Sequence, residues 1–196
     1  MRRGLIILLC ALSACVTTPK PKPDGDDLLL KLSPKSLGRE LQLAQRITVV
    51  RGSEKKQTFD AQLEVDAAEV RIAAVALGQT IASLKWNGEK LQKQVSTHVP
   101  DAISADRILS DVQLAWWPAD AIRAALPGGY ALDEANAQRT LTRNGEGLAR
   151  IEYQGSAPAW AHVKLAHLKY GYELDIESVD LSAQSEPPGA TTLGGK

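Results

Sequence analysis

The sequence predicts an α+β fold, in which one curved antiparallel sheet forms a half-open β-barrel with two short helices plugging its mouth. Around residues 41–96 and 138–181, apolar residues alternate with polar ones, which is typical of strands with one buried face. Between them, residues 104–126 show helical spacing instead. Because only this one helical block is available to cover the apolar face of the sheet, the sheet is expected to wrap around it.

The composition is that of an ordinary globular chain. Of the 196 residues, 44% are hydrophobic and 23% are charged, and 23 basic residues balance 23 acidic ones. These values argue against wholesale disorder, a collagen-like repeat and a membrane protein with several spans. A net charge of zero also argues against a nucleic-acid partner, because such proteins normally carry a basic excess.

The N-terminal residues have the pattern of a secretory signal. Arg2 and Arg3 precede an apolar run that is too short for a membrane helix, which needs about 20 apolar residues. The run ends in Leu12-Ser13-Ala14-Cys15, which resembles a bacterial lipobox and implies cleavage before Cys15 and attachment of lipid there. Residues 1–14 are therefore expected to be a signal peptide of the lipoprotein type. The alternative is an ordinary signal in which the cysteine is incidental.

The expected mature chain divides into three parts. Residues 15–27 hold the lipidated cysteine and a polar, proline-rich tether, residues 28–183 form the barrel domain, and residues 184–196 form a disordered tail. In lipoproteins of this kind an Asp directly after the cysteine favours the inner membrane, whereas Val16 follows here. The expected location is therefore the periplasmic face of the outer membrane, with Cys15 as the lipid anchor.

Five antiparallel strands are expected before the helical block, separated by turn residues. Asn87-Gly88 is the strongest turn signal because both residue types tolerate the positive φ of a tight hairpin, and Gly78 marks another turn. The five expected strand segments are 41–49, 58–66, 69–77, 80–86 and 90–96.

Two helices and four more strands follow. Ser104 can cap the first helix, in which Ile108, Val112 and Trp116 recur at helical spacing. Pro118 breaks it, and a second short helix over residues 119–126 stops at Pro127-Gly128-Gly129. The later strands are expected at residues 138–143, 149–153, 162–170 and 172–181, with a β-bulge between Leu165 and Ala166, where the alternation changes phase.

Six short motifs occur in succession over most of residues 37–181. They are Ala76-Leu77-Gly78-Gln79-Thr80-Ile81, Leu109-Ser110-Asp111-Val112, Trp116-Trp117-Pro118, Leu126-Pro127-Gly128-Gly129, Leu141-Thr142-Arg143-Asn144-Gly145 and Ala149-Arg150-Ile151-Glu152-Tyr153. This succession behind a lipobox resembles the outer-membrane lipoprotein receptor LolB and, more closely, the LolB-like lipoproteins encoded in aryl-polyene and related lipid gene clusters. Residues 154–162, with Pro158 and Trp160, depart from the receptor pattern.

The resemblance implies an unclosed barrel with helices at its mouth and an apolar cavity for acyl chains. It also implies that Leu77, at the position of a loop leucine of the receptor, is a membrane-inserting residue that assists delivery of the cargo. The alternative for Leu77 is an ordinary turn residue with a half-buried side chain.

The inward-facing residues are mainly small or aliphatic, and they either pack as a solid core or line a cavity. Walls without charges suit a carrier, because they contact an acyl chain without strong directional bonds. The residues predicted to line the cavity are Ile47, Val49, Phe59, Leu63, Val65, Ile72, Leu84, Trp86, Ile108, Val112, Trp116 and Ile151.

No catalytic residue is predicted. The sequence has no Gly-x-Ser-x-Gly elbow, no His-Glu-x-x-His helix and no phosphate-binding glycine loop. His162 and His167 are five residues apart in a predicted strand and so face opposite sides, which argues against a shared metal. Glu173, Asp175 and Glu177 are expected to form the wetted face of the last strand. The chain is therefore expected not to be an enzyme and to need no cofactor or metal.

Two functions from different classes remain. The first is an outer-membrane-anchored binding protein that takes up the acyl or polyene chains of a lipid, or the acyl chains of a lipoprotein, and transfers them to the membrane. Its expected partners are those acyl chains, the outer membrane itself and a periplasmic LolA-like carrier. The second is a non-catalytic accessory subunit of an envelope assembly, whose barrel is filled by its own side chains.

Overall fold

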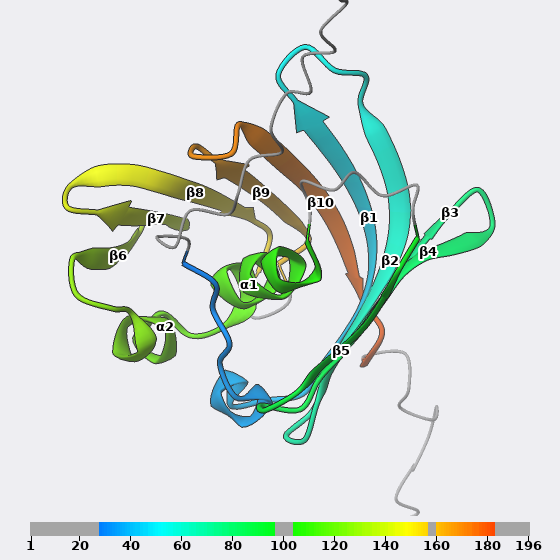
Figure 1. Cartoon of the computed structure of the whole chain (residues 1–196), viewed down its shortest axis with the longest axis horizontal. Coiled ribbons are helices and arrows are strands. Elements are labelled where there is room, and N and C mark those ends of the chain that lie inside the picture. Colours follow the sequence, from blue (N-terminus) through cyan, green and yellow to red (C-terminus); the bar gives the residue numbers. More distant parts are fainter. Residues whose placement is uncertain (1–27, 97–103, 157–159, 183–196) are drawn as a thin grey trace, which may run out of the picture.

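The computed structural model describes residues 28–96, 104–156 and 160–182 (Figure 1). All ten strands of this part belong to one antiparallel sheet, in the order β5-β4-β3-β2-β1-β10-β9-β8-β7-β6. Neighbouring strands in the sheet are also consecutive in the chain, except for β1 and β10. These two strands join the two halves of the sheet through a register from Leu43↔Asp180 to Arg51↔Tyr172. The expected α+β chain with one curved antiparallel sheet is confirmed.

The predicted strands and helices are present, with boundaries that shift by a few residues. Before the helices lie the short 3₁₀-helix η1 (Pro34–Leu37) and strands β1 (Leu41–Arg51), β2 (Gln57–Val65), β3 (Val70–Ala76), β4 (Gln79–Trp86) and β5 (Leu91–Val95). The helices are α1 (Ala105–Trp116) and α2 (Ala119–Ala125). They are followed by β6 (Tyr130–Ala135), β7 (Gln138–Arg143), β8 (Glu146–Gln154), β9 (His162–His167) and β10 (Tyr172–Asp180).

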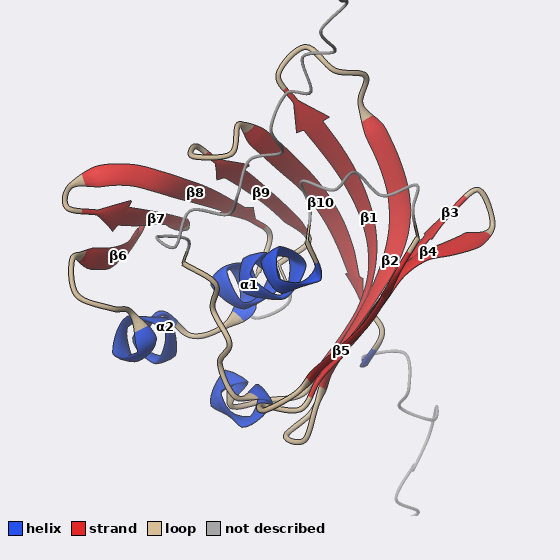
Figure 2. Ribbon diagram, viewed as in Figure 1, coloured by secondary structure: helices blue, strands red, loops and turns tan. Residues whose placement is uncertain are grey.

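The sheet is strongly curved but does not close. Its edge strands, β5 and β6, each pair on one side only, so a barrel is not formed by the described strands. Figure 2 shows α1 in the hollow of the sheet, whereas α2 lies beside β6 at one edge. There the Nε atom of Arg123 donates a hydrogen bond of 2.9 Å to the carbonyl of Leu132. Only α1 therefore occupies the hollow, where two helices were expected.

Helix α1 begins and ends where its sequence requires. The Ser104 hydroxyl accepts a hydrogen bond of 3.2 Å from the backbone N–H of Arg107, which caps the first turn. Trp117 has an extended backbone, and Pro118 follows, so the helix stops there. Trp116 and Trp117 are 4% and 0% exposed, and they pack the helix end into the core.

The segment from Leu28 to Ser33, which we call the N-terminal strap, lies along α1. The backbone N–H of Leu30 donates to the Ser110 hydroxyl at 3.0 Å. The side-chain amide of Gln113 both accepts from the N–H of Leu32 and donates to its carbonyl, each at 2.8 Å. These bonds explain why Ser110 and Gln113 of α1 are buried, since the partners of both side chains are backbone groups of the strap.

The predicted bulge between Leu165 and Ala166 is wrong. The pairing of β9 with both β8 and β10 runs without a shift, and Val163, Leu165 and His167 all face inward. The apparent change of phase arose because the inward position after Leu165 holds a buried histidine instead of an apolar residue. Register shifts occur instead at Ala74/Val75 and Leu141/Thr142.

Strand β6 was not anticipated from the sequence. It is an edge strand with only Leu132 buried, so it shows almost no alternation. A two-residue turn connects it to β7, and both turn residues, Asn136 and Ala137, have positive φ values of 51° and 56°. Asn136 was the available turn signal, but Ala rarely occupies such a position.

Among the described residues, no helix combines the length and the apolar composition that a membrane crossing requires.

Candidate functional site

An apolar cavity lies between α1 and the concave face of the sheet. Its volume is about 90 Å³, which is room for roughly six water-sized groups. Its walls come from three consecutive strands of the first half, two strands of the second half and one face of α1. The lining residues are Gln45, Ile47, Val49, Phe59, Ala61, Leu63, Ile72, Ala74, Ile108, Asp111, Val112, Ala115, Trp116, Leu165, Tyr172, Leu174 and Ile176.

Small side chains on the sheet leave this space open. Ala61 and Ala74 are directly opposite each other on β2 and β3, and both line the cavity. Ala115 faces the same space from α1. Each of these three alanines has only a methyl group as its side chain. The helix and the sheet therefore do not pack to full density here, as they would with larger side chains.

The cavity is more exposed at the end that lies toward the β1–β2 loop. Ile47, Val49 and Phe59 are half-buried there, whereas Leu63, nearer the other end of β2, is 1% exposed. The accessible end is therefore formed by aliphatic and aromatic side chains, a lining that makes dispersion contacts and no directional bonds with a bound molecule.

Asp111 and Tyr172 supply most of the polar atoms of the wall. The Tyr172 hydroxyl donates a hydrogen bond to the Asp111 carboxylate, and both residues are buried. Burial raises the pKa of the Asp111 carboxyl to about 6, although the Tyr172 hydrogen bond and the nearby Arg107 charge lower it. Burial and the neighbouring carboxylate raise the pKa of Tyr172 as well, so its hydroxyl stays protonated.

The structure brings most of the predicted lining residues together around this cavity. Ile47, Val49, Phe59, Leu63, Ile72, Ile108, Val112 and Trp116 line it. Val65, Leu84, Trp86 and Ile151 do not: they are at most 4% exposed and belong to the packed core. The alternation identifies the inward face of a strand but gives no position along it, which is why these four were included.

Several lining residues were missed by the sequence reasoning. Ala61, Ala74 and Leu165 share the inward phase of residues that were chosen, so the phase itself could have identified them. Tyr172 also had this signal, because it shares the phase of Leu174 and Ile176 and lies opposite to the predicted wetted face. Asp111 carried no such signal, because a carboxylate is rarely buried and is therefore not expected at an inward position.

Leu77 does not line the cavity but lies at the tip of the β3–β4 hairpin, on the right of Figure 1. Its side chain is fully exposed, at 103%. Leu77 and Gly78 form a two-residue turn with φ values of 50° and 74°, a geometry that favours Asn and Gly and strains a leucine. Leu77 is therefore not the half-buried turn residue of the simpler interpretation.

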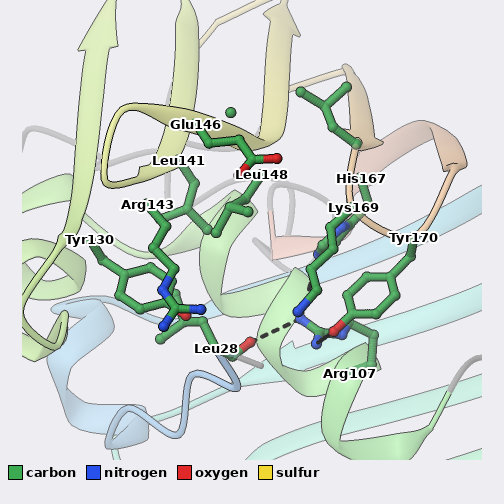
Figure 3. A pocket seen from close by; sticks show the side chains of 12 residues that line it. Leu28, Arg107, Tyr130, Leu141, Arg143, Glu146, Leu148, His167, Lys169 and Tyr170 are labelled. Atoms are coloured by element: carbon green, nitrogen blue, oxygen red, sulfur yellow. Dashed lines mark hydrogen bonds between the residues drawn. The ribbon is translucent and has the colours of Figure 1, made fainter. Parts of the chain in front are cut away.

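A second, polar pocket lies beside the apolar cavity (Figure 3). Its volume is about 450 Å³, and it is built by α1, β7, β8, the β9–β10 turn and the N-terminal strap. Arg107, Arg143 and Lys169 contribute three positive charges against the single carboxylate of Glu146. The other residues around it are Leu28, Tyr130, Leu141, Gly147, Leu148, His167, Leu168 and Tyr170.

Other predicted features fall outside the site or outside the described part of the chain. Cys15, the signal segment, the tether and the tail from residue 184 lie outside the described residues. His162 and His167 face opposite sides of β9 as expected. In the described ranges no cluster of three or more His, Cys, Asp or Glu side chains is arranged to hold a metal.

Comparisons with known proteins give a family and a distant structural likeness. No curated protein matches the sequence. A LolA superfamily protein from Nitrosomonas europaea, known from its crystal structure, is 11% identical, with a TM-score of 0.42 over 78% of this chain and 90% of the other. The model of a family described as "Protein of unknown function (DUF3261)" matches residues 42–180, from β1 to the end of β10. Since this match covers most of the chain, the protein belongs to the DUF3261 family.

Proposed function

We propose that this protein is a lipid-anchored periplasmic protein that binds the acyl chain of a lipid or lipoprotein and transfers it to the outer membrane. The observation that carries the proposal is the apolar cavity between α1 and the sheet. Each methylene group gains about 0.8 kcal/mol on leaving water, so an acyl chain in the periplasm needs an enclosure of this kind. Apart from Gln45 and the hydrogen-bonded pair Asp111–Tyr172, the wall residues are apolar and offer the chain dispersion contacts, which allows release into a bilayer.

The exposed leucine of the β3–β4 turn supports the transfer step. Natural turns of this geometry use Asn or Gly, and a leucine there costs about 1–2 kcal/mol of backbone strain. Because the Leu77 side chain is fully exposed, folding buries none of its apolar surface, and no hydrophobic stabilisation offsets this strain. The residue is explained if Leu77 enters a membrane and the hairpin carries it there.

The lipobox supports the location. A lipidated Cys15, followed by a tether over residues 16–27, would hold the folded domain within reach of the membrane that receives the cargo. A periplasmic LolA-like carrier is the proposed donor of the chains.

The small size of the cavity favours a second candidate. Pockets for small molecules usually have volumes of about 300–1,000 Å³, against about 90 Å³ here. Under the alternative, the hollow is a packing defect in a filled sheet, and the protein is a structural accessory subunit of an envelope assembly.

Filling the cavity tests the binding step. Ala74→Phe places a ring in the cavity, and we expect it to weaken binding of cis-parinaric acid, a fluorescent fatty acid, by at least about tenfold. The measurement is a fluorescence titration of the full chain carrying Cys15→Ser, which removes the site of lipid attachment. The matched control is Ala73→Phe, whose side chain is on the opposite face of the same strand and should leave the affinity unchanged.

Overpacking costs about 1–3 kcal/mol, so the smaller Ala74→Leu variant is measured alongside and should weaken binding to a lesser degree. If wild type does not bind the fatty acid, or if Ala74→Phe folds and binds as wild type does, the accessory role is the better account.

Replacing the exposed leucine tests the transfer step. Leu77→Glu should leave fatty-acid affinity unchanged and slow delivery to phosphatidylethanolamine–phosphatidylglycerol vesicles by at least about fivefold, because a charge resists entry into the bilayer. Delivery is followed as the loss of protein-bound fluorescence after mixing with vesicles. Leu77→Asn relieves the turn strain and should also slow delivery, which separates loss of the apolar side chain from damage to the hairpin.

Gln79→Glu adds the same charge two residues away while keeping the leucine, and should transfer normally. Normal delivery by both Leu77 variants would remove this residue from the mechanism.

A further inference from the structure

Two neighbouring turns lie side by side at one end of the curved sheet. Because the sheet is antiparallel, the β1–β2, β3–β4, β7–β8 and β9–β10 turns all lie at the same end (Figure 1). Arg51 at the end of β1 pairs with Tyr172 at the start of β10. This pairing places the β1–β2 turn, residues 52–56, beside the β9–β10 turn, residues 168–171. We call these two turns the paired turns.

Exposed lysines give the paired turns a positive surface. Lys55 and Lys56 are both exposed in the β1–β2 turn, where Glu54 is the one acidic residue. Within the described ranges, neither lysine has a carboxylate partner. Both charges can therefore meet an anion outside the protein.

An exposed leucine lies in the adjoining turn. Leu168 begins the β9–β10 turn and is 51% exposed, and Leu77 is fully exposed in the β3–β4 turn at the same end of the sheet. Of the large apolar side chains in the described part of the chain, Val179 alone is also more than half exposed, and it lies near the other end of β10. Exposed apolar side chains next to lysines are typical of surfaces that bind at the membrane interface.

The N-terminal strap joins the domain at this end as well. The Leu28 carbonyl accepts a hydrogen bond of 2.9 Å from Nη1 of Arg107, whose Nη2 atom donates at 2.9 Å to the Tyr170 hydroxyl in the β9–β10 turn. From Leu28 the strap follows α1 toward η1, at the opposite end of the sheet. The chain therefore enters the described domain beside the paired turns, and a lipid anchor at Cys15 would hold this end nearest to the membrane.

We propose that the paired turns dock onto a bilayer that carries anionic lipids, with Lys55 and Lys56 on the lipid phosphates and Leu168 in the interface. This inference rests on the proposed function, because it names the surface through which the domain meets the membrane that receives the cargo. The positive charge selects anionic lipids over zwitterionic ones. The more exposed end of the apolar cavity lies toward the β1–β2 turn, so docking here directs that end to the bilayer.

Sedimentation with vesicles tests the role of the lysines. The protein is the full chain carrying Cys15→Ser, so the N-terminal segments are the same in every variant. We expect Lys55→Gln/Lys56→Gln to weaken binding about tenfold to phosphatidylcholine vesicles containing about 30% phosphatidylglycerol, and to leave binding to pure phosphatidylcholine unchanged. The matched control, Lys35→Gln/Lys90→Gln, removes two exposed lysines from the opposite end of the sheet and should change binding less than about twofold.

The same assay tests the leucine. Leu168→Gln should weaken binding to both kinds of vesicle by at least about threefold, because burial of apolar surface in the interface does not depend on lipid charge. Val179→Gln, at a site that is 55% exposed but lies away from the paired turns, is the matched control and should bind normally. Lys55→Arg/Lys56→Arg keeps both charges and should keep the preference for anionic vesicles.

The outcomes separate this inference from acyl binding. None of Lys55, Lys56 and Leu168 lines the apolar cavity, so their variants should bind cis-parinaric acid as wild type does. If wild type shows no preference for anionic vesicles, or if the control variants lose binding equally, the docking surface is overturned while any measured acyl binding stands. If vesicle binding depends on the paired turns but no fatty acid binds, the docking surface stands and the acyl cargo is removed.

Discussion

Replacing Arg139 with alanine is expected to lower the free energy of unfolding by about 3–5 kcal/mol, the largest effect of any single substitution proposed for this chain. Its Nη1 atom donates to the carbonyls of Leu114, Ala115 and Trp117, at 2.9, 3.3 and 2.7 Å. These carbonyls end α1 and have no further helical turn to pair with. Alanine would leave them buried without this donor and would also leave Glu134 without its ion pair.

Urea unfolding followed by circular dichroism measures this loss. Arg150→Ala, on the exposed face of β8, is the control and should change the stability by less than about 0.5 kcal/mol. Arg139→Lys keeps the charge but lacks the forked set of donors of a guanidinium. Its loss in unfolding free energy should lie between those of Arg139→Ala and Arg150→Ala. A loss below about 1 kcal/mol for Arg139→Ala would mean that water replaces the guanidinium at the helix end.

The Asp111→Asn variant is expected to become more stable relative to wild type as the pH rises from 4 to 7, by about 2 kcal/mol. Burial raises the pKa of Asp111 from 3.8 to about 6, so the folded state holds the proton more tightly than the unfolded state. The stabilisation from this proton is complete below pH 4 and is lost as the pH rises through 6. Asparagine is uncharged throughout, and its amide oxygen can still accept the Tyr172 hydroxyl, so the variant lacks this dependence.

The measurement is the difference in unfolding free energy between variant and wild type across that pH range, since other carboxylates cancel in the difference. Asp66, Asp106 and Asp180 have lowered pKa values, so their contribution to stability increases with pH. This contribution is the same in the variant and in the wild type. Asp133→Asn, an exposed substitution on β6, is the control. If the difference in unfolding free energy between Asp111→Asn and wild type does not change with pH, the Asp111 carboxylate ionises in the folded state without a loss of stability.

Alternation of apolar residues predicted nine of the ten strands because most strands bury one face against α1 or the core. It failed at two places. The edge strand β6, Tyr130–Ala135, buries only Leu132, and its residues do not alternate regularly between apolar and polar types. In β9 the inward position of His167 is filled by a polar ring that contacts Arg107 and Tyr170, so the sequence suggested a bulge that does not exist.

The candidate site was predictable in its walls but not in its polar parts. Ile47, Phe59 and Ile108 follow from periodicity, because any apolar residue in phase faces the hollow. The polar pocket has no sequence signature: Arg107, Arg143 and Lys169 come from a helix, a strand end and a turn, and only the folding of the sheet places them together. The turn at Leu77 was recognised from Gly78, whereas the full exposure of the leucine depends on how far the hairpin projects.

The N-terminal strap would connect the proposed lipid anchor at Cys15 mechanically to the interior of the domain. Leu28, Leu30 and Leu32 are hydrogen-bonded in turn to Arg107, Ser110 and Gln113, so the strap runs parallel to α1 and in the same direction. Tension applied upstream of Leu28 therefore loads these bonds together, in shear, and is delivered to the helix that forms one wall of the cavity. If Cys15 is anchored as proposed, a pull from the membrane would reach α1 before any other element of the domain, and α1 is the wall against which a bound hydrocarbon would rest.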